Sequence, residues 1–261
     1  MEIRLDGRSA LITGGSTGLG LAMAKEFAAS GADVAIVGRR PDVLEEARRE
    51  IAAVAAAARV HAVAADVATA EGTDLAFRST VAALGKVDIL VNNAGKSQVG
   101  AFEDLTDRIW QEDFDLKLFA AVRLARAALP AMKQRGWGRI INVLATSAKT
   151  PRAGTAPTAV SRAAGLALTK VLAGEGAPHN VLVNALLVGL IDSDQWMRRH
   201  AASGQDVTYE EFLARMGAGV PLGRVGSARE FASIACFLAS DAAGYITGTG
   251  INVDGGASPV V

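Results

Sequence analysis

A glycine-rich segment near the start of the chain has the residue types and spacing to bind phosphate. It reads Thr13-Gly14-Gly15-Ser16-Thr17-Gly18-Leu19-Gly20, after an apolar run and before a helical pattern. Glycines let the backbone approach a pyrophosphate, and the N–H groups and partial positive charge of a helix N-terminus attract its oxygens. The alternative, a purely structural turn, is disfavoured by the motifs that follow. We predict that a dinucleotide binds at Gly14, Ser16, Thr17, Gly18, Leu19 and Gly20.

Two arginines, Arg39 and Arg40, follow the next apolar run. At the end of a second strand, an acidic residue would hydrogen-bond the ribose 2′-hydroxyl of NAD(H), whereas a guanidinium matches the 2′-phosphate of NADP(H). This chain has no acid at that place. The sequence therefore favours NADP(H), with NAD(H) still possible because one or both arginines could simply solvate the start of the next helix.

Two later motifs complete a family pattern. The tetrapeptide Asn92-Asn93-Ala94-Gly95 follows a third apolar run, and Tyr245-Ile246-Thr247-Gly248 and Val253-Asp254-Gly255-Gly256 lie near the end of the chain. With the glycine spacing, these motifs resemble the short-chain dehydrogenase/reductase family, especially its 3-oxoacyl-carrier-protein-reductase-like members. The resemblance covers nearly the whole chain, from Leu5 to Gly256.

The resemblance implies further cofactor contacts. In addition to the glycine segment, it implies Asp66 and Val67 at the adenine, Asn93 and Ala94 at the ribose with Gly95 beside them, and Ile191 and Ser193 at the nicotinamide. The family usually has proline before the glycine that is Gly189 here, and this chain has Val188 in that place.

The catalytic tetrad of the family is missing. Its acid is the tyrosine of a Tyr-x-x-x-Lys motif, but neither Tyr209 nor Tyr245 precedes a lysine by four residues. The flanking sequences assign asparagine, serine, tyrosine and lysine of the tetrad to Asp115, Ala145, Thr158 and Arg162. An aliphatic hydroxyl is a far weaker acid than a phenol, and arginine stays protonated. Loss of proton transfer costs about 10²–10⁴ in rate, so slow hydride transfer could survive.

Two of these replacements introduce opposite charges at positions that are neighbours in the family's site. We predict an ion pair between Asp115 and Arg162 that lines the pocket, the alternative for Asp115 being a solvated helix face. Weaker candidates for the missing polar groups follow the strand at Ala145 or lie in the later flap: Thr146, Ser147, Lys149, His200 and Tyr209. For each of these, exposed loop polarity is the favoured interpretation.

Short apolar, β-branched runs alternate with longer stretches of helical period. The predicted strands are 10–12, 34–37, 60–63, 89–91, 139–143, 181–184 and 250–253. Continuous apolar strands separated by helices indicate a parallel sheet covered on both faces. The fold class is therefore α/β, a single doubly wound Rossmann domain with a seven-stranded parallel sheet. Ligands bind outside the carboxyl ends of such strands, where Gly14, Arg39, Asp66, Asn93 and Gly189 lie.

One domain is predicted over residues 1–261, with one irregular region. Residues 187–220 are too long for an ordinary connection, and we expect a small helical flap that covers substrate. The alanine-rich stretch 52–58 continues a helical phase and is interpreted as a helix end. Helices at 106–135 and 155–175 have apolar faces of the kind that the family uses in subunit contacts, so a homotetramer or homodimer is expected.

Composition excludes several classes of function. Lys+Arg and Asp+Glu both number 27 in 261 residues, so nothing attracts nucleic acid or an anionic membrane. The charged N-terminus and the lack of a long apolar stretch predict a cytoplasmic protein. The lone Cys236 is expected to be a buried structural thiol. His61 and His179 lack partners at metal-ligand spacing, so we predict no metal.

The leading interpretation is an NADP(H)-dependent oxidoreductase with divergent catalytic residues that acts on a small carbonyl or alcohol. Two alternatives stay open. One is non-redox chemistry, a dehydration or an isomerisation, and the other is a catalytically silent binding or regulatory subunit.

Overall fold

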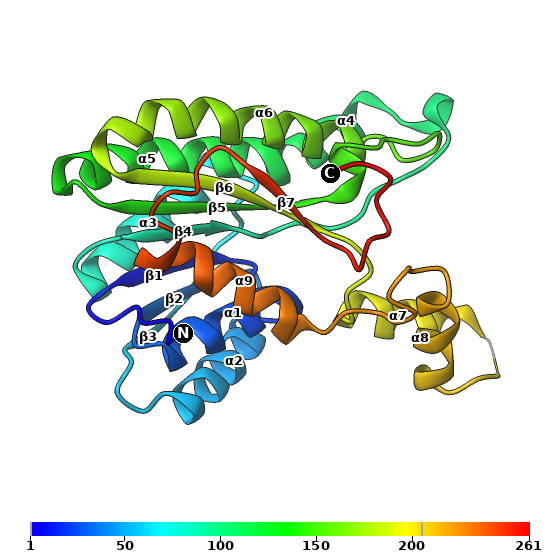
Figure 1. The fold of residues 1–261 in the computed structure, drawn as a ribbon, viewed down its shortest axis with the longest axis horizontal. Helices are drawn as coiled ribbons and strands as arrows, with labels where there is room; N and C mark the ends of the chain where they lie inside the picture. The colour runs from blue at the N-terminus through cyan, green and yellow to red at the C-terminus, as the bar shows by residue number, and fades with distance from the viewer. Residues whose placement is uncertain (1, 205) are drawn as a thin grey trace.

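A computed structural model describes residues 2–204 and 206–261 of the chain. Its centre is a seven-stranded sheet in which every pair of neighbouring strands is parallel, in the order β3-β2-β1-β4-β5-β6-β7 (Figure 1). The strands are β1 (Ser9–Thr13), β2 (Asp33–Gly38), β3 (Val60–Ala64), β4 (Ile89–Asn92), β5 (Gly138–Ala145), β6 (Val181–Val188) and β7 (Gly250–Val253). All seven predicted strands are confirmed, as is the doubly wound Rossmann fold.

Helices cover both faces of this sheet (Figure 1). On one face lie α1 (Gly18–Ala29), α2 (Pro41–Val54) and α9 (Ala228–Ala239), and on the other lie α3 (Ala70–Leu84), α4 (Asp107–Phe114), α5 (Ala120–Arg135) and α6 (Thr158–Gly176). The alanine-rich stretch 52–58, interpreted as a helix end, begins in the last turn of α2, but α2 ends at Val54 and residues 55–58 lie beyond the helix.

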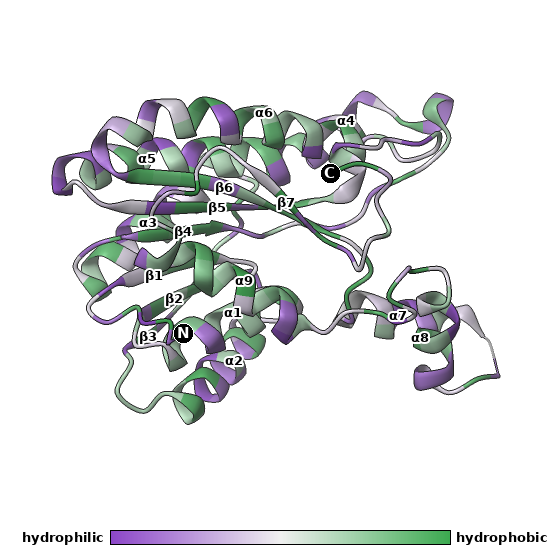
Figure 2. Cartoon of the chain, in the orientation of Figure 1, coloured by the Kyte–Doolittle hydropathy of each residue, from purple (hydrophilic) through white to green (hydrophobic). Residues whose placement is uncertain are grey.

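Alternate residues of the central strands enter two separate cores. Ile12 packs in the cluster that holds Phe27 and Phe231, beneath α1 and α9, whereas Leu11 packs in the cluster that holds Leu124, beneath α5. Since successive side chains of a strand point to opposite faces, both faces of β1 are buried, and the strands stand out as hydrophobic in Figure 2. Cys236 is 1% exposed, as expected of a structural thiol.

The helix that runs beside the site contains an irregular turn. Between α4 and α5, residues Asp115–Phe119 form a π-helical turn. Such a turn inserts an extra residue and rotates the side chains that follow, and turns of this kind are frequent at functional sites.

The region between β6 and α9 contains two short helices, α7 (Asp194–Ser203) and α8 (Tyr209–Gly217). They project from one end of the sheet (Figure 1). A capping box fixes the start of α8, since the Thr208 hydroxyl accepts from Glu211 N–H and the Glu211 carboxylate accepts from Thr208 N–H. Residue 205, inside the predicted flap, lies outside the described residues.

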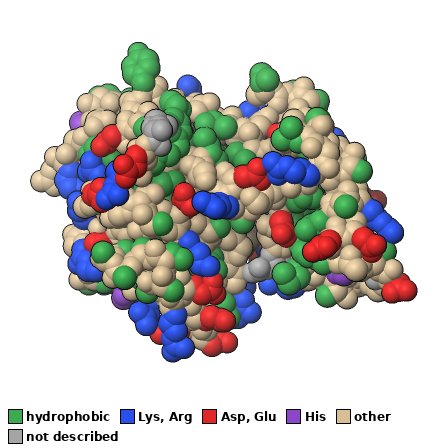
Figure 3. All heavy atoms as spheres, turned by 60° about the horizontal axis from the view of Figure 1, so that its bottom comes forward, with side chains coloured by type: hydrophobic (Ala, Val, Ile, Leu, Met, Phe, Trp, Pro, Cys, Tyr) green, Lys and Arg blue, Asp and Glu red, His purple; other side chains and the backbone are tan. Residues whose placement is uncertain are grey.

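None of the helices described in residues 2–204 and 206–261 has the length and apolar character to cross a membrane. On the face drawn in Figure 3, acidic and basic side chains are interspersed, in keeping with the equal numbers of positive and negative residues.

Candidate functional site

A cavity of about 910 Å³ opens at the carboxyl ends of the strands. It extends from the glycine-rich turn after β1, across the ends of β4 and β5, to α6 and α7. Every residue that the sequence indicated for cofactor or catalysis lines it: Gly14, Ser16, Thr17, Gly18, Leu19, Gly20, Arg39, Arg40, Asp66, Val67, Asn93, Ala94, Gly95, Asp115, Thr158, Arg162, Ile191 and Ser193.

The glycine-rich turn leaves the first N–H groups of α1 facing the cavity. Thr17 is the N-cap residue of α1, and its side chain makes no capping hydrogen bond. Gly20 is required by packing, because a Cβ atom there would overlap the carbonyl oxygen of Gly14. This combination of a close backbone approach and uncapped N–H groups suits an anion.

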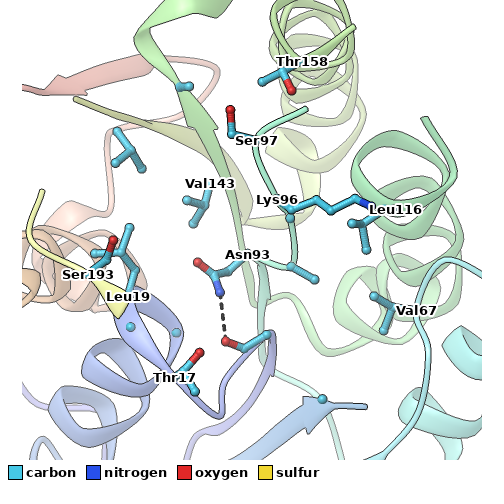
Figure 4. Close-up of a pocket in the computed structure, with 18 of the residues that line it drawn as sticks. Thr17, Leu19, Val67, Asn93, Lys96, Ser97, Leu116, Val143, Thr158 and Ser193 are labelled. Carbon is cyan, nitrogen blue, oxygen red and sulfur yellow. Dashed lines mark hydrogen bonds between the residues drawn. The ribbon is translucent and has the colours of Figure 1, made fainter. Parts of the chain in front are cut away.

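Asn93 fixes the turn to the neighbouring strand end. Its Nδ2 donates to the backbone oxygens of Thr13 at 2.9 Å and Gly14 at 3.2 Å, and the Thr13 hydroxyl accepts from the N–H groups of Asn93 and Ala94. Figure 4 shows Asn93 and Val143 between the Thr17–Leu19 end of the cavity and Thr158 at the other end. The two ends are thus parts of one site.

The two arginines after β2 are exposed at the rim of the cavity. Within the described part of the chain, the guanidinium groups of Arg39 and Arg40 have no ion-pair or hydrogen-bond partner in the protein. Asp66 follows β3, the strand that pairs with β2, and accepts a hydrogen bond from Ala68 N–H at 3.0 Å. Two free guanidinium groups at this place are suited to a phosphate.

The predicted ion pair between Asp115 and Arg162 is wrong. The Asp115 carboxylate instead accepts from Gln111 Nε2 at 3.1 Å and lies 3.5 Å from Arg123 Nη2, on its own helix. Arg162 donates through Nη1 to the backbone oxygen of Val143 at 2.7 Å. Both residues line the cavity, but each is paired elsewhere.

The residue that this helix sends to Thr158 is Lys117, two positions beyond Asp115. Lys117 Nζ donates to the Thr158 hydroxyl at 2.7 Å and to the carboxylate of Asp113, which also accepts from the Ser161 hydroxyl at 2.6 Å. The side chains of Lys117 and Asp113 are 1% and 0% exposed. Lys117 and Asp113 thus form a buried ion pair in which both side chains make further hydrogen bonds, to Thr158 and to Ser161. Burial of charge is tolerated in such an arrangement.

Burial lowers the pKa of Lys117 from 10.5 to about 8, and the positive charges of Arg162 and Lys96 act in the same direction. Asp113 opposes the shift, through its hydrogen bond and its charge. Lys117 thus changes its charge close to physiological pH, as a group that exchanges protons must.

The Thr158 hydroxyl connects this pair to the cavity and to the loop after β4. Besides the bond from Lys117, it accepts from the Gln98 N–H at 2.9 Å and donates to the Gln98 carbonyl oxygen at 2.7 Å. Its bonding capacity is therefore filled by the protein. An unassisted Thr158 has no spare proton for a substrate in this arrangement.

Arg162 lines the same end of the cavity and has one unsatisfied donor. Its Nε is buried without a hydrogen-bond partner among the described residues. Its guanidinium packs on the face of Gly95, where a Cβ atom would lie 2.6 Å from Nη2. Burial lowers the pKa of Arg162 to about 10, against the attraction of Asp113, so it stays positive at neutral pH.

Of the weaker candidates for the missing polar groups, only some reach the cavity. Ser147 lines the cavity, but Lys149 is held by Gly250 O at 2.8 Å and Asn252 Oδ1 at 3.0 Å. His200 Nε2 lies 2.9 Å from Val207 O, and Tyr209 donates to Asp192 Oδ1 at 2.5 Å. Neither residue lines the cavity.

No group of three or more His, Cys, Asp or Glu side chains that could hold a metal ion occurs in residues 2–204 and 206–261.

Lys117, Asp113 and Ser161 were missed by sequence reasoning. Asp113 and Lys117 are four residues apart, the spacing that pairs side chains on a helix. That spacing was the available signal, although in most helices it marks an exposed ion pair.

Comparison with known proteins gives a consistent result. The family model described as enoyl-(acyl carrier protein) reductase matches residues 14–258. The chain is 34% identical over 256 residues to 3-oxoacyl-[acyl-carrier-protein] reductase FabG of Aquifex aeolicus, covering 98% of this chain and 99% of that one.

Two similar solved structures have NADPH bound. L-sorbose reductase from Gluconobacter frateurii, complexed with NADPH and L-sorbose, is 36% identical with a TM-score of 0.95 over 100% of both chains. A short chain oxidoreductase from Pseudomonas aeruginosa PAO1 that contains an atypical catalytic center is 34% identical with a TM-score of 0.92, over 99% of this chain and 100% of that one.

Proposed function

Because the chain belongs to the short-chain dehydrogenase/reductase family, we propose that it is an NADP(H)-dependent oxidoreductase that acts on a small carbonyl or alcohol through an atypical active site. One observation carries the proposal. A single cavity joins an anion-binding helix start and two unpartnered arginines to a polar cluster that includes Thr158 and Arg162 but neither tyrosine of the chain.

The residues present fit the dinucleotide. The uncapped start of α1 would hold the pyrophosphate, and Arg39 and Arg40 would hold the 2′-phosphate. The remaining parts would lie against Asp66 and Val67, against Asn93, Ala94 and Gly95, and against Ile191 and Ser193. The NADPH complex of the L-sorbose reductase supports this choice of cofactor. When bound, the nicotinamide supplies or accepts the hydride.

The substrate oxygen would lie at the end of the cavity where Arg162 and Thr158 meet. Arg162 keeps its charge at neutral pH and lines the cavity, so it can polarise a carbonyl and stabilise the oxyanion that develops. Ala145, in the place of the family's serine, offers no donor, which leaves Arg162 as the principal electrophile. Asp115 borders the same space while held by Arg123.

In this proposal, Lys117 and not Asp115 occupies the place of the family's asparagine. The support is its contact with Thr158, since the asparagine and tyrosine of the tetrad are neighbours in the family's site. The site would then replace asparagine, serine, tyrosine and lysine by Lys117, Ala145, Thr158 and Arg162.

The helices α7 and α8 would act as the substrate flap expected at residues 187–220. Trp196, Arg198 and Arg199 line the cavity from α7, which supports the proposal that this region covers the substrate.

A homo-oligomer is also proposed, because Phe119, at the end of the π-helical turn, and Val160 and Val171, on α6, are 40%, 44% and 59% exposed. Size-exclusion chromatography with light scattering tests it; a monomer at micromolar concentration would refute it.

The activity is tested with purified protein. NADPH binding is measured by calorimetry, and NADPH oxidation is followed at the nicotinamide band with L-sorbose, ethyl acetoacetate and 2,3-butanedione. Oxidation that depends on the carbonyl supports the proposal. Tight NADPH binding with no turnover on any of the three would instead favour a silent binding subunit, and no binding at millimolar NADPH would refute the cofactor assignment.

A further inference from the structure

Building on the proposed function, we propose that Lys117 is the proton source for carbonyl reduction and that it acts through the hydroxyl of Thr158. The two side chains come from different elements, the π-helical turn after α4 and the start of α6, and meet with 2.7 Å between Nζ and Oγ1. Lys117 is itself shielded from the cavity, whereas Thr158 lines it.

The charged groups around Lys117 hold its ammonium in place and also favour loss of one of its protons. Three charged groups face its amine: Asp113 from α4, Arg162 from α6 and Lys96 from the loop after β4. Asp113 fixes the ammonium in place, while burial and the two cations favour release of a proton. Because Asp113 also accepts from Ser161, its carboxylate stays bound when the amine becomes neutral.

The Thr158 hydroxyl can turn to a substrate at little cost. At rest its proton is directed to the Gln98 carbonyl oxygen. That oxygen also faces the backbone N–H of Thr158 at 3.4 Å, so it is not left without a donor when the hydroxyl turns away. A buried carbonyl oxygen without a hydrogen-bond donor is costly, and the Thr158 N–H spares the Gln98 oxygen that cost.

The step is balanced in atoms and electrons. The carbonyl carbon gains a hydride from the reduced nicotinamide, and the carbonyl oxygen forms its O–H bond with the proton of Thr158. The Thr158 oxygen takes a proton from the Lys117 ammonium, which becomes a neutral amine. After the alcohol is released, solvent in the cavity returns a proton to the amine through the Thr158 hydroxyl. Oxidation of an alcohol is the reverse and needs the neutral amine.

The test compares pH profiles of turnover in variants matched for charge and shape. Lys117→Arg keeps the charge but cannot release a proton near neutral pH. We expect kcat with L-sorbose or ethyl acetoacetate to fall about 10²-fold, with little change in NADPH affinity, and the fall in wild-type kcat near pH 8 to disappear. Thr158→Val should lose as much, and Thr158→Ser should recover most of the activity. Lys133→Arg, on α5 and outside the cavity, is the control.

A second readout is independent of turnover. In cofactor-free protein with isotope-labelled lysine, the NMR signal that disappears in Lys117→Arg should titrate near pH 8. Lys117 that stays protonated beyond pH 10, or an active Lys117→Arg or Thr158→Val enzyme with the wild-type pH profile, would overturn the inference and leave the proposed function intact. Wild-type protein that binds NADPH but reduces no carbonyl would overturn both.

Where Lys117→Arg does not fold, the double variant Asp113→Asn with Lys117→Met removes both charges together and takes its place. It should bind NADPH like the wild type and lose the same fraction of kcat. Retained kcat in the folded double variant would overturn the inference.

Discussion

Lys117 Nζ, in the π-helical turn after α4, lies 2.7 Å from the hydroxyl oxygen of Thr158 at the start of α6, 41 residues further along the chain. The contact places a buried amine, with its pKa lowered to about 8, one hydrogen bond from the cavity. In a site whose lining includes neither Tyr209 nor Tyr245, it is the arrangement that can replace a phenol.

Removing the carboxylate of this cluster should be severely destabilising. Asp113→Ala leaves Lys117 buried without its counter-ion, which costs about 3–5 kcal/mol of unfolding free energy. For a chain of this size the thermal midpoint should fall by about 10 °C. Asp115→Ala, on the same helix, breaks a partly exposed pair and should cost about 1 kcal/mol or less. Equal losses in the two variants, measured by calorimetry, would contradict the description of the buried pair.

The same group makes stability depend on pH. Since the pKa of Lys117 falls from 10.5 to about 8 on folding, the unfolded chain binds more protons than the folded one between these values. The unfolding free energy of the wild type should therefore rise with pH from 8 to 10.5, relative to the Asp113→Asn, Lys117→Met double variant. Denaturant unfolding of both proteins at pH 7.5, 9 and 10.5 measures this difference. A difference that stays constant across the range would show that Lys117 is not perturbed.

Charge at the end of β2 should decide cofactor preference. The variant Arg39→Ser, Arg40→Ser removes two guanidinium groups from the 2′-phosphate, and charged hydrogen bonds contribute about 1.5–3 kcal/mol each. We expect NADPH affinity to fall at least tenfold and NADH affinity to change less than threefold, as measured by calorimetry. Arg49→Ser, on the exposed side of α2, is the control and should change neither. Equal weakening of both cofactors would contradict the assignment.

A methyl group on Gly95 should displace Arg162 without unfolding the protein. The added Cβ would lie 2.6 Å from Nη2, the movable end of a long side chain. Because displacement by about 1 Å can cost on the order of 10² in rate, kcat/KM of Gly95→Ala should fall by one to two orders of magnitude. Gly174→Ala, in α6 with open space around it, should keep full activity and gain up to about 1 kcal/mol. Wild-type kinetics in Gly95→Ala would argue against a role for Arg162.

The sequence predicted the sheet well, and the residues that it indicated for a cofactor all line one cavity, for a physical reason. Buried parallel strands such as β1 and β5 are continuous apolar runs, and glycine spacing after β1 is constrained by backbone contact. The end of the cavity near Thr158 was harder to predict, because the four-residue spacing of Asp113 and Lys117 usually marks an exposed ion pair and nothing in the sequence shows that this pair is buried against Thr158. The sequence also did not show which cation pairs with Asp115. In the structure this cation is Arg123, eight residues further along the chain, and not Arg162.

The most direct test of the account is the pH dependence of carbonyl-dependent NADPH oxidation by the wild-type protein in a stopped-flow instrument, from pH 6 to 10. Proton delivery from Lys117 predicts a single-turnover rate that is constant below pH 7 and falls tenfold per pH unit above about pH 8. A rate that stays constant to pH 9.5 and falls only near pH 10, or no oxidation at any pH, would contradict it.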